Sequence, residues 1–242
     1  MISAKSALVT GANKGIGREV ARQLAIDGFK VWLGARDAER GTRAAAELRA
    51  EGLDVHWLEI DVTNDASVAK SVSTVRNESS HLDVLVNNAG VAINYDRPPS
   101  EQAMADIKAT YEVNVFGPIR VTQAYLPLLL AAPAARIVMV SSYSGSIVRA
   151  LDSASPSYSV NMLGYGSSKS ALNAITVSFA KELAVRGVRV NAAAPGYTAT
   201  DLNQHKGRRT VQQAAQIIVR LATLDDTGPT GGYFDDDGPV PW

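Results

Sequence analysis

The chain of 242 residues contains no cysteine. This absence excludes disulfide bonds, thiolate catalysis and zinc ribbons, and it is typical of proteins kept in a reducing compartment. An excess of one charge is absent too, because lysine plus arginine and aspartate plus glutamate both number 24. A chain without net charge lacks the basic surface that attracts nucleic acids or anionic membranes, so we predict neither partner.

Long hydrophobic runs are also missing. The longest apolar stretch, Ala124–Ala135, is interrupted by Pro127 and Pro133, and it is shorter than the roughly 20 residues that a membrane-spanning helix needs. The first residues lack the apolar core of a signal peptide. We therefore expect a soluble, cytoplasmic protein, and the length favours one large α/β domain over residues 1–242.

No metal site is predicted. His56, His81 and His205 lack the spacing that metal ligands show. The acidic run Asp235–Asp237 is interpreted as a solvated turn, with a cation site as the alternative.

Short apolar, β-branched segments alternate with longer helical patterns, which is typical of βαβ units and a parallel sheet. The strand segments show little alternation, as expected where helices cover both faces. The predicted strands are Ser6–Val9, Lys30–Ala35, Asp54–Glu59, Val84–Asn87, Arg136–Ser141, Val188–Ala193 and Gly232–Phe234. The predicted helices are Gly17–Asp27, Ala38–Glu51, Ala66–Glu78, Ser100–Leu130, Tyr165–Arg186 and Thr210–Leu224.

These elements predict a single doubly wound α/β domain of the Rossmann type, with about seven strands in the order 3-2-1-4-5-6-7. We expect a mostly parallel sheet with helices on both faces. Right-handed crossovers place the ligand cleft at the carboxyl ends of the strands. The segment Tyr143–Gly164 is rich in serine and has no clear period, so it is interpreted as a functional loop.

A glycine-rich turn, Thr10–Gly17, joins the first strand to the first helix. Such a turn presents backbone amides and a helix N-terminus that can bind phosphate. It is not a P-loop, because Lys14 precedes Gly15 and no serine or threonine follows for Mg²⁺. An ordinary turn that binds nothing is the alternative, but the position after the first strand favours a dinucleotide.

The end of the second strand carries another cofactor signal. An acidic residue there would bind the ribose 2′-hydroxyl of NAD, whereas an arginine accommodates the 2′-phosphate of NADP. Arg36 stands at this position and Lys14 lies in the glycine-rich turn. Two charge-assisted contacts of roughly 1.5–3 kcal/mol each would favour NADP(H). The alternatives are that both cations are solvated, or that Asp37 neutralises Arg36.

The motifs resemble those of the short-chain dehydrogenases/reductases along nearly the whole chain. Each motif alone is weak, but together they follow the family's order on the expected elements. They are Thr10-Gly11-x-x-x-Gly15-x-Gly17, Asp61-Val62, Asn87-Asn88-Ala89-Gly90, Asn114, Ser141-Ser142, Tyr165-x-x-x-Lys169 and Pro195-Gly196 followed by Thr198 and Thr200.

The resemblance implies four catalytic residues, Asn114, Ser142, Tyr165 and Lys169. Ser142 would hold the substrate oxygen, and Asn114 would anchor a water molecule that leads to Lys169. The residues expected at the cofactor, NADP(H), are Gly11, Asn13, Lys14, Gly15, Ile16, Gly17, Arg36, Asp61, Val62, Asn88, Ala89, Gly90, Tyr165, Lys169, Pro195, Gly196, Thr198 and Thr200.

The spacing of Tyr165 and Lys169, four residues, places both on one face of a helix. A free phenol has a pKa of about 10, too high for efficient proton transfer at neutral pH. An ammonium group about 4 Å away stabilises the phenolate by roughly 4 kcal/mol. We therefore predict that Lys169 lowers the pKa of Tyr165 by up to about three units, although an ordinary amphipathic pair has the same spacing.

Within the family, the chain is most similar to the carbonyl reductases. Three segments carry this similarity: Asn13-Lys14-Gly15, Ala35-Arg36-Asp37 and the C-terminal stretch Gly228–Trp242. That branch reduces ketones, aldehydes and quinones with NADPH. The similarity implies reversible hydride transfer between NADP(H) and a small carbonyl or alcohol substrate, with Tyr165 as general acid and base.

The substrate and the assembly are left open by the sequence. Ser142 and Tyr165 are 23 residues apart (165 minus 142), which is longer than in most of the family and shorter than in its monomeric carbonyl reductases. The chain could therefore be a monomer, a homodimer or a homotetramer.

A partly apolar substrate pocket is expected. Its walls would be formed by Tyr143, residues 144–164 and Tyr197–Gly207. Two alternative functions are left open. One is a sensor that binds the cofactor without turnover, and the other is a dehydration or epimerisation catalysed on the same scaffold.

Overall fold

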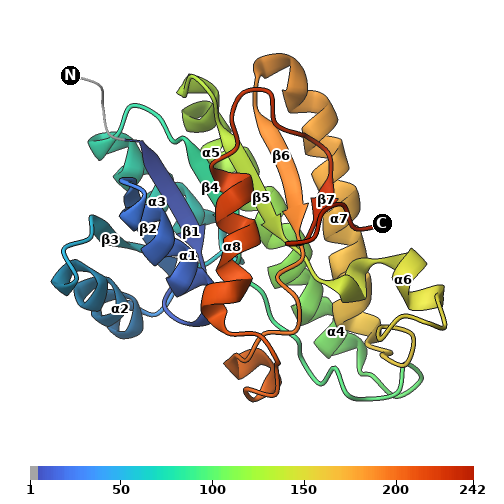
Figure 1. Ribbon diagram of the computed structural model, residues 1–242. Coiled ribbons are helices and arrows are strands. Elements are labelled where there is room, and N and C mark those ends of the chain that lie inside the picture. The colour runs from blue at the N-terminus through green and yellow to red at the C-terminus, as the bar shows by residue number, and fades with distance from the viewer. Residues whose placement is uncertain (1–4) are drawn as a thin grey trace.

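One parallel sheet forms the centre of the molecule in the computed structural model, which describes residues 5–242. Met1–Ala4 lie outside the described residues. The prediction that the first residues form no signal peptide falls partly on them. The strand order is β3-β2-β1-β4-β5-β6-β7, and all neighbouring strands are parallel (Figure 1). The predicted order is confirmed. The strands are β1 (Ser6–Thr10), β2 (Lys30–Ala35), β3 (Val55–Glu59), β4 (Val84–Asn87), β5 (Arg136–Val140), β6 (Arg189–Ala193) and β7 (Tyr233–Phe234).

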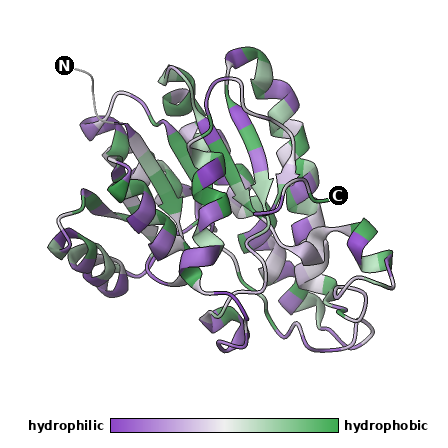
Figure 2. Ribbon diagram, in the orientation of Figure 1, coloured by the Kyte–Doolittle hydropathy of each residue, from purple (hydrophilic) through white to green (hydrophobic). Residues whose placement is uncertain are grey.

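Helices cover both faces of this sheet, as predicted. On one face α1, α2 and α8 pack through buried side chains such as Leu24 and Ile217. On the other face α3, α5 and α7 pack through side chains such as Leu129 and Leu172. Figure 2 shows hydrophobic residues concentrated along the strands between these two layers. The covering helices are α1 (Gly15–Ile26), α2 (Ala38–Ala50), α3 (Asp65–Glu78), α5 (Gly117–Ala131), α7 (Leu163–Leu183) and α8 (Val211–Ala222).

The long helix predicted over Ser100–Leu130 is wrong in two respects. The helix begins later, with α4 (Met104–Tyr111), and a π-helical segment, η1 (Glu112–Phe116), separates α4 from α5. Pro118 gives the physical reason, because it has no amide hydrogen to continue the regular ladder. The Gly117 amide instead donates to the Glu112 carbonyl, five residues back.

The segment interpreted as a loop, Tyr143–Gly164, contains two short helical turns, η2 (Tyr143–Gly145) and α6 (Ile147–Leu151). Two further single turns, η3 (Ala184–Arg186) and η4 (Asp201–Asn203), follow α7 and β6. Within residues 5–242, no helix combines the length and hydrophobicity that crossing a membrane requires.

The centre of the sheet should dominate stability. Leu85 on β4 is fully buried, whereas Leu151 on α6 is 75% exposed. We expect Leu85→Ala to lower the free energy of unfolding by about 2–5 kcal/mol through lost burial and a cavity. The matched change Leu151→Ala should cost less than about 0.5 kcal/mol. Urea unfolding of both variants checks this, and equal losses would contradict the assigned core.

Candidate active site

The glycine-rich turn after β1 is held close to the end of β4. Gly11 and Gly15 have φ values of +64° and +58°, which side chains rarely adopt. A Cβ atom on Gly17 would lie 2.3 Å from the Asn88 amide nitrogen. That amide donates to the carbonyl oxygens of Thr10 at 2.8 Å and Gly11 at 3.2 Å. The turn therefore needs glycine for close packing against β4.

Thr10 is part of the predicted turn, but the sequence predicted no role for it in the site. Its hydroxyl accepts hydrogen bonds from the backbone amides of Asn88 and Ala89, both at 3.0 Å. It therefore ties the start of the turn to the segment after β4. The signal available in the sequence was its place directly before Gly11, at the buried end of a strand.

The first turn of α1 lies at the cleft end of the sheet, with Asn13 in the turn and Ile16 in the helix. Lys14 is the N-cap residue, but its side chain makes no capping hydrogen bond to the helix. The ammonium group of Lys14 instead lies 2.6 Å from the Asp201 carboxylate in η4. This contact lowers the pKa of Asp201. His205 also pairs with Asp201, at 2.9 Å.

Arg36 follows β2 and is exposed. Among the described residues it has no ion-pair partner within 4 Å. Asp37 forms no ion pair with Arg36, because its carboxylate accepts from the Arg40 amide and side chain, both at 2.9 Å. These bonds cap α2 and lower the pKa of Asp37. The Arg36 guanidinium is therefore available to an anion.

The segment after β3 contains Asp61 and Val62. Burial favours the neutral form of Asp61, but hydrogen bonds from the Thr63 amide and hydroxyl, at 2.9 and 2.7 Å, outweigh it and lower its pKa. Arg120 holds the same segment, since its guanidinium donates to the Val62 carbonyl at 2.7 Å. Gly117 allows this packing, because a Cβ atom there would lie 2.9 Å from a Val62 methyl group.

The segment after β6 returns the chain to the glycine-rich turn. Gly196 has a φ of +76°, and Thr198 is buried, with its hydroxyl directed at the carbonyls of Pro195 (3.3 Å) and Gly196 (3.2 Å). Thr200 lies beside the turn, because a Cβ atom on Gly15 would be 3.6 Å from its methyl group. Of these predicted residues, Thr200 is therefore the one that contacts the glycine-rich turn.

Tyr165 and Lys169 lie in the first turns of α7, and the Lys169 amine is 5.7 Å from the centre of the Tyr165 ring. This amine is buried and donates to the Val140 carbonyl at 2.8 Å. Burial lowers the pKa of Lys169 to about 8. Burial also raises the pKa of Tyr165, and the neighbouring Ser142 hydroxyl opposes only part of this rise. The predicted lowering by Lys169 is therefore wrong, because burial sets the direction of the shift and the opposing effect comes from Ser142, not from Lys169.

Asn114 lies in the π-helical segment and is fully buried. Its side chain binds both polar backbone atoms of Val91, at 2.9 Å each, and donates to the Ser168 hydroxyl at 3.0 Å. A Cβ atom on Gly90 would be 3.4 Å from Asn114 Oδ1 and 3.6 Å from Lys169 Nζ. The bare glycine therefore leaves a small space between these two polar atoms.

Ser142 follows β5 and begins η2, where its hydroxyl accepts from the Ser144 amide at 3.2 Å. The turn packs tightly on α7, because a Cβ atom on Gly145 would lie 2.8 Å from the Lys169 backbone. Asn173 on α7 donates to the Gly145 carbonyl at 3.2 Å. The four predicted catalytic residues thus come from three segments that pack against one another.

Comparison with known proteins identifies the family. A family model described as short chain dehydrogenase matches residues 5–210. The chain belongs to the short-chain dehydrogenase family. It is 33% identical to the carbonyl reductase (NADPH) 1 of Sus scrofa, over 98% of this chain and 93% of that protein. It is also 33% identical to the (-)-isopiperitenone reductase of Mentha piperita, over 96% of each.

Solved structures agree with this family. The NADPH-bound carbonyl reductase from chicken fatty liver superposes with a TM-score of 0.85 at 27% identity, covering 99% of each chain. The salutaridine reductase of Papaver somniferum superposes with a TM-score of 0.82 at 28% identity, covering 96% of this chain and 99% of that one. The protein is therefore a short-chain dehydrogenase in fold and family, and an oxidoreductase.

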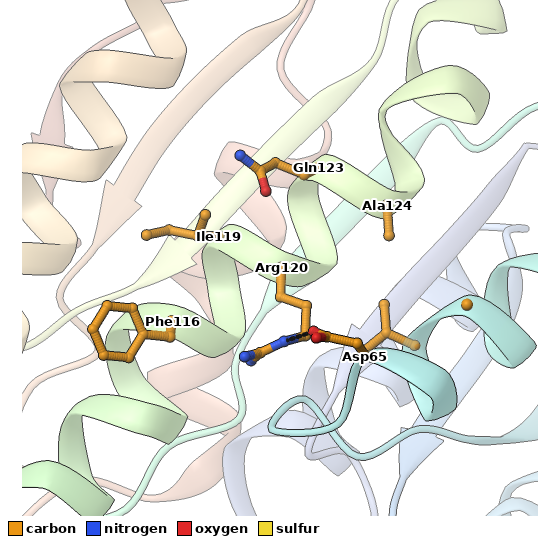
Figure 3. Close-up of a pocket in the computed structure, with 8 residues that line it drawn as sticks. Asp65, Phe116, Ile119, Arg120, Gln123 and Ala124 are labelled. Atoms are coloured by element: carbon orange, nitrogen blue, oxygen red, sulfur yellow. Dashed lines mark hydrogen bonds and ion pairs between the residues drawn. The ribbon is translucent and has the colours of Figure 1, made fainter.

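A surface hollow of this dehydrogenase, between α3 and α5, is lined by residues other than the predicted site residues. Figure 3 shows Phe116 and Ile119 beside it, with Arg120 directed at Asp65. The Arg120 guanidinium also pairs with Glu112, at 2.9 Å. Because two carboxylates already neutralise this cation, the hollow is not an anion site.

The acidic run near the end of the chain is engaged in structural contacts. Asp235 accepts from the Tyr143 hydroxyl at 2.8 Å, which contributes with burial to raising the pKa of Tyr143 to about 12. Asp236 pairs with Arg209. Within residues 5–242, no group of three or more His, Asp or Glu side chains is arranged to hold a metal ion.

The buried amine of Lys169 should leave a signature in the pH dependence of stability. The pKa of Lys169 falls from 10.5 to about 8 on folding. Between these values the unfolded chain binds more protons, so stability rises with pH through this window, and below it the full penalty applies. Relative to Lys169→Met, the free energy of unfolding of the wild type should rise by up to about 3 kcal/mol between about pH 7.5 and about pH 10.

Urea unfolding across this pH range measures that gain. Lys181→Met removes an exposed lysine of the same helix and is the matched control. Its stability should follow the wild type at every pH. A wild type that runs parallel to Lys169→Met would show that the pKa of Lys169 is not lowered.

Proposed function

We propose that this dehydrogenase reduces the carbonyl group of a ketone, aldehyde or quinone with NADPH, in a reversible hydride transfer. The observation that carries the proposal is that Gly90, after β4, faces both Asn114 and Lys169, while the turn that Ser142 begins packs on α7, the helix that carries Tyr165. The carbonyl reductase relatives support the reaction, and the NADPH named for two of them supports the cofactor. A further structural relative, a gluconate 5-dehydrogenase from Burkholderia cenocepacia, is described in complex with NADP.

The residues present fit a dinucleotide phosphate. Gly11, Gly15 and Gly17 place no side chain at three positions of the turn, and a Cβ on Gly17 would collide with Asn88. Bare amides and a helix N-terminus suit the pyrophosphate, and the unpaired Arg36 suits a 2′-phosphate. Asp61 and Val62 would contact the adenine, and Asn88, Ala89 and Gly90 would border the ribose. Pro195, Gly196, Thr198 and Thr200 would lie along the nicotinamide.

Bound NADPH would supply the hydride that reduces the carbonyl carbon. Tyr165 would give its phenolic proton to the carbonyl oxygen as that oxygen becomes an alkoxide. Ser142 would donate a hydrogen bond to the same oxygen and would stabilise its developing charge. The positive charge of the oxidised nicotinamide, added to that of Lys169, would lower the pKa of Tyr165.

Lys169 remains mostly protonated at neutral pH, because its pKa is about 8. It can therefore act as a cation beside Tyr165 and return a proton to it after each turnover. The space at Gly90, between the Lys169 amine and the Asn114 amide oxygen, is where such a proton would be passed on. Asn114 is suited to hold that route in place because it is fully buried and hydrogen-bonded to Val91.

The mouth of the site suggests a substrate with an apolar body. Ile147, Leu151 and Tyr158 of the insert are 62%, 75% and 58% exposed. Tyr197 and Leu202, on the segment after β6, are 55% and 41% exposed. Covering such side chains with an apolar ligand removes hydrophobic surface from water and favours binding. Conversion confined to highly charged carbonyl compounds would contradict this preference.

Replacement of the tyrosine tests the proposed chemistry. Tyr165→Phe removes the proton donor but keeps the ring, so we expect kcat to fall by about a hundredfold or more. NADPH affinity should change by less than about twofold, because the ring still fills its place. The measurements are NADPH oxidation with a panel of carbonyl compounds and NADPH binding by fluorescence. Retained turnover in the variant would refute the assignment of Tyr165.

Two rival functions have distinct outcomes in the same assay. A sensor or scaffold would bind NADPH and leave every carbonyl compound unchanged. A dehydratase or epimerase would convert its substrate without net consumption of NADPH. Oxidation of NADPH in step with alcohol formation excludes both.

Charge removal tests the choice of NADPH over NADH. Arg36→Ala should raise the KM for NADPH by about tenfold or more, since one charge-assisted contact is worth roughly 1.5–3 kcal/mol. The KM for NADH should hardly change. Arg43→Ala, an exposed arginine on α2, is the matched control and should affect neither cofactor. A wild type that prefers NADH would overturn the assignment of Arg36.

A further inference from the structure

Gln102 is a buried polar residue that none of the recognised motifs includes. It lies before α4 and is 8% exposed. Its amide oxygen accepts from the Gly164 backbone amide at 2.9 Å. Its amide nitrogen donates to the carbonyl oxygens of Ile93 at 3.1 Å and Asn94 at 3.4 Å. One side chain therefore joins the loop after β4 to the start of α7.

The start of α7 needs such a partner. The first amides of a helix have no acceptor within the helix, and a side chain usually supplies one from the N-cap position. The N-cap residue of α7 is Met162, which makes no capping hydrogen bond. Gln102 provides the acceptor from 62 residues earlier in the chain. Gly164 permits the approach, because a Cβ atom there would lie only 3.1 Å from the Gln102 amide nitrogen.

Tyr165 directly follows the amide that Gln102 holds. On its other side, the Tyr165 carbonyl accepts from the Ser168 hydroxyl at 2.7 Å. That hydroxyl accepts from Asn114 at 3.0 Å, and Asn114 is bound to Val91 in the same loop that Gln102 contacts. Two amide side chains thus connect one loop to α7 just before and just after Tyr165.

We propose that Gln102 is a positioning residue that fixes the backbone of Tyr165 for proton transfer. This inference rests on the proposed function. Gln102 has no hydrogen bond to the glycine-rich turn, whose contacts run through Thr10 and Asn88. Its loss should therefore reduce kcat while NADPH binding is kept, since small misplacements of a catalytic group are costly.

Three substitutions separate the two halves of the amide. Gln102→Met keeps the length and removes all hydrogen bonds, and we expect kcat to fall about tenfold or more with the Kd for NADPH within about twofold. Gln102→Glu keeps an acceptor for the Gly164 amide and should recover part of the lost kcat. Gln102→Asn, one methylene shorter, should lose kcat as well and replaces Gln102→Met should that variant not fold. Gln123→Met, an exposed glutamine on α5, is the matched control.

Amide hydrogen exchange gives a readout that does not require turnover. The segment 163–168 should exchange faster in Gln102→Met than in the wild type, and Gln102→Glu should restore its protection. Unchanged kcat in Gln102→Met, or a loss of NADPH affinity equal to the loss of kcat, would overturn the positioning role. If the wild type itself oxidises no NADPH with any carbonyl compound, the proposed function fails. In that case the amide exchange of residues 163–168 tests Gln102 separately. Equal exchange in Gln102→Met and the wild type would overturn the positioning role of Gln102.

Discussion

The contact between β1 and β4 at their carboxyl ends is the constraint on which the site depends. The chain crosses from β1 to β2 on one side and reaches β4 on the other, so a crevice opens where the two directions diverge. The Thr10 hydroxyl and the Asn88 amide close the bottom of that crevice with hydrogen bonds of 2.8–3.0 Å. Because Gly17 packs against Asn88, the first turn of α1 is held at the same place. The turn and the segment after β4 therefore form one rigid edge.

Burial works against ionisation of both Tyr165 and Lys169. It raises the pKa of Tyr165 and lowers that of Lys169 to about 8, so each is driven toward its neutral form. The spacing of the two residues on α7 does not by itself make the phenol acidic. Tyr165 therefore stays protonated, as the proposed proton donor must be. The proposed oxidised cofactor would add positive charge next to Tyr165 and, together with the hydrogen bond from Ser142, would favour its ionised form.

The segment after β6 is linked to the glycine-rich turn through charge. Asp201 is paired with Lys14, and His205 shares the same carboxylate. In the proposed complex, a 2′-phosphate near Arg36 would compete with Asp201 for Lys14. The two cations expected at the phosphate are thus not equivalent, because Arg36 is unpaired within the described residues and Lys14 is not.

Local patterns in the sequence determined much of this protein. Alternating short apolar strands and longer helices predicted the parallel sheet, and the turn Thr10–Gly17 predicted a phosphate-binding end of β1. Such features depend on neighbouring residues, so the sequence displays them directly. The tertiary structure alone decided the pairing of Lys14 with Asp201 across 187 residues and the bond from Gln102 to Gly164. It also decided the direction of the Tyr165 pKa. Each depends on burial or on a partner far along the chain, and only the folded chain determines which distant groups meet.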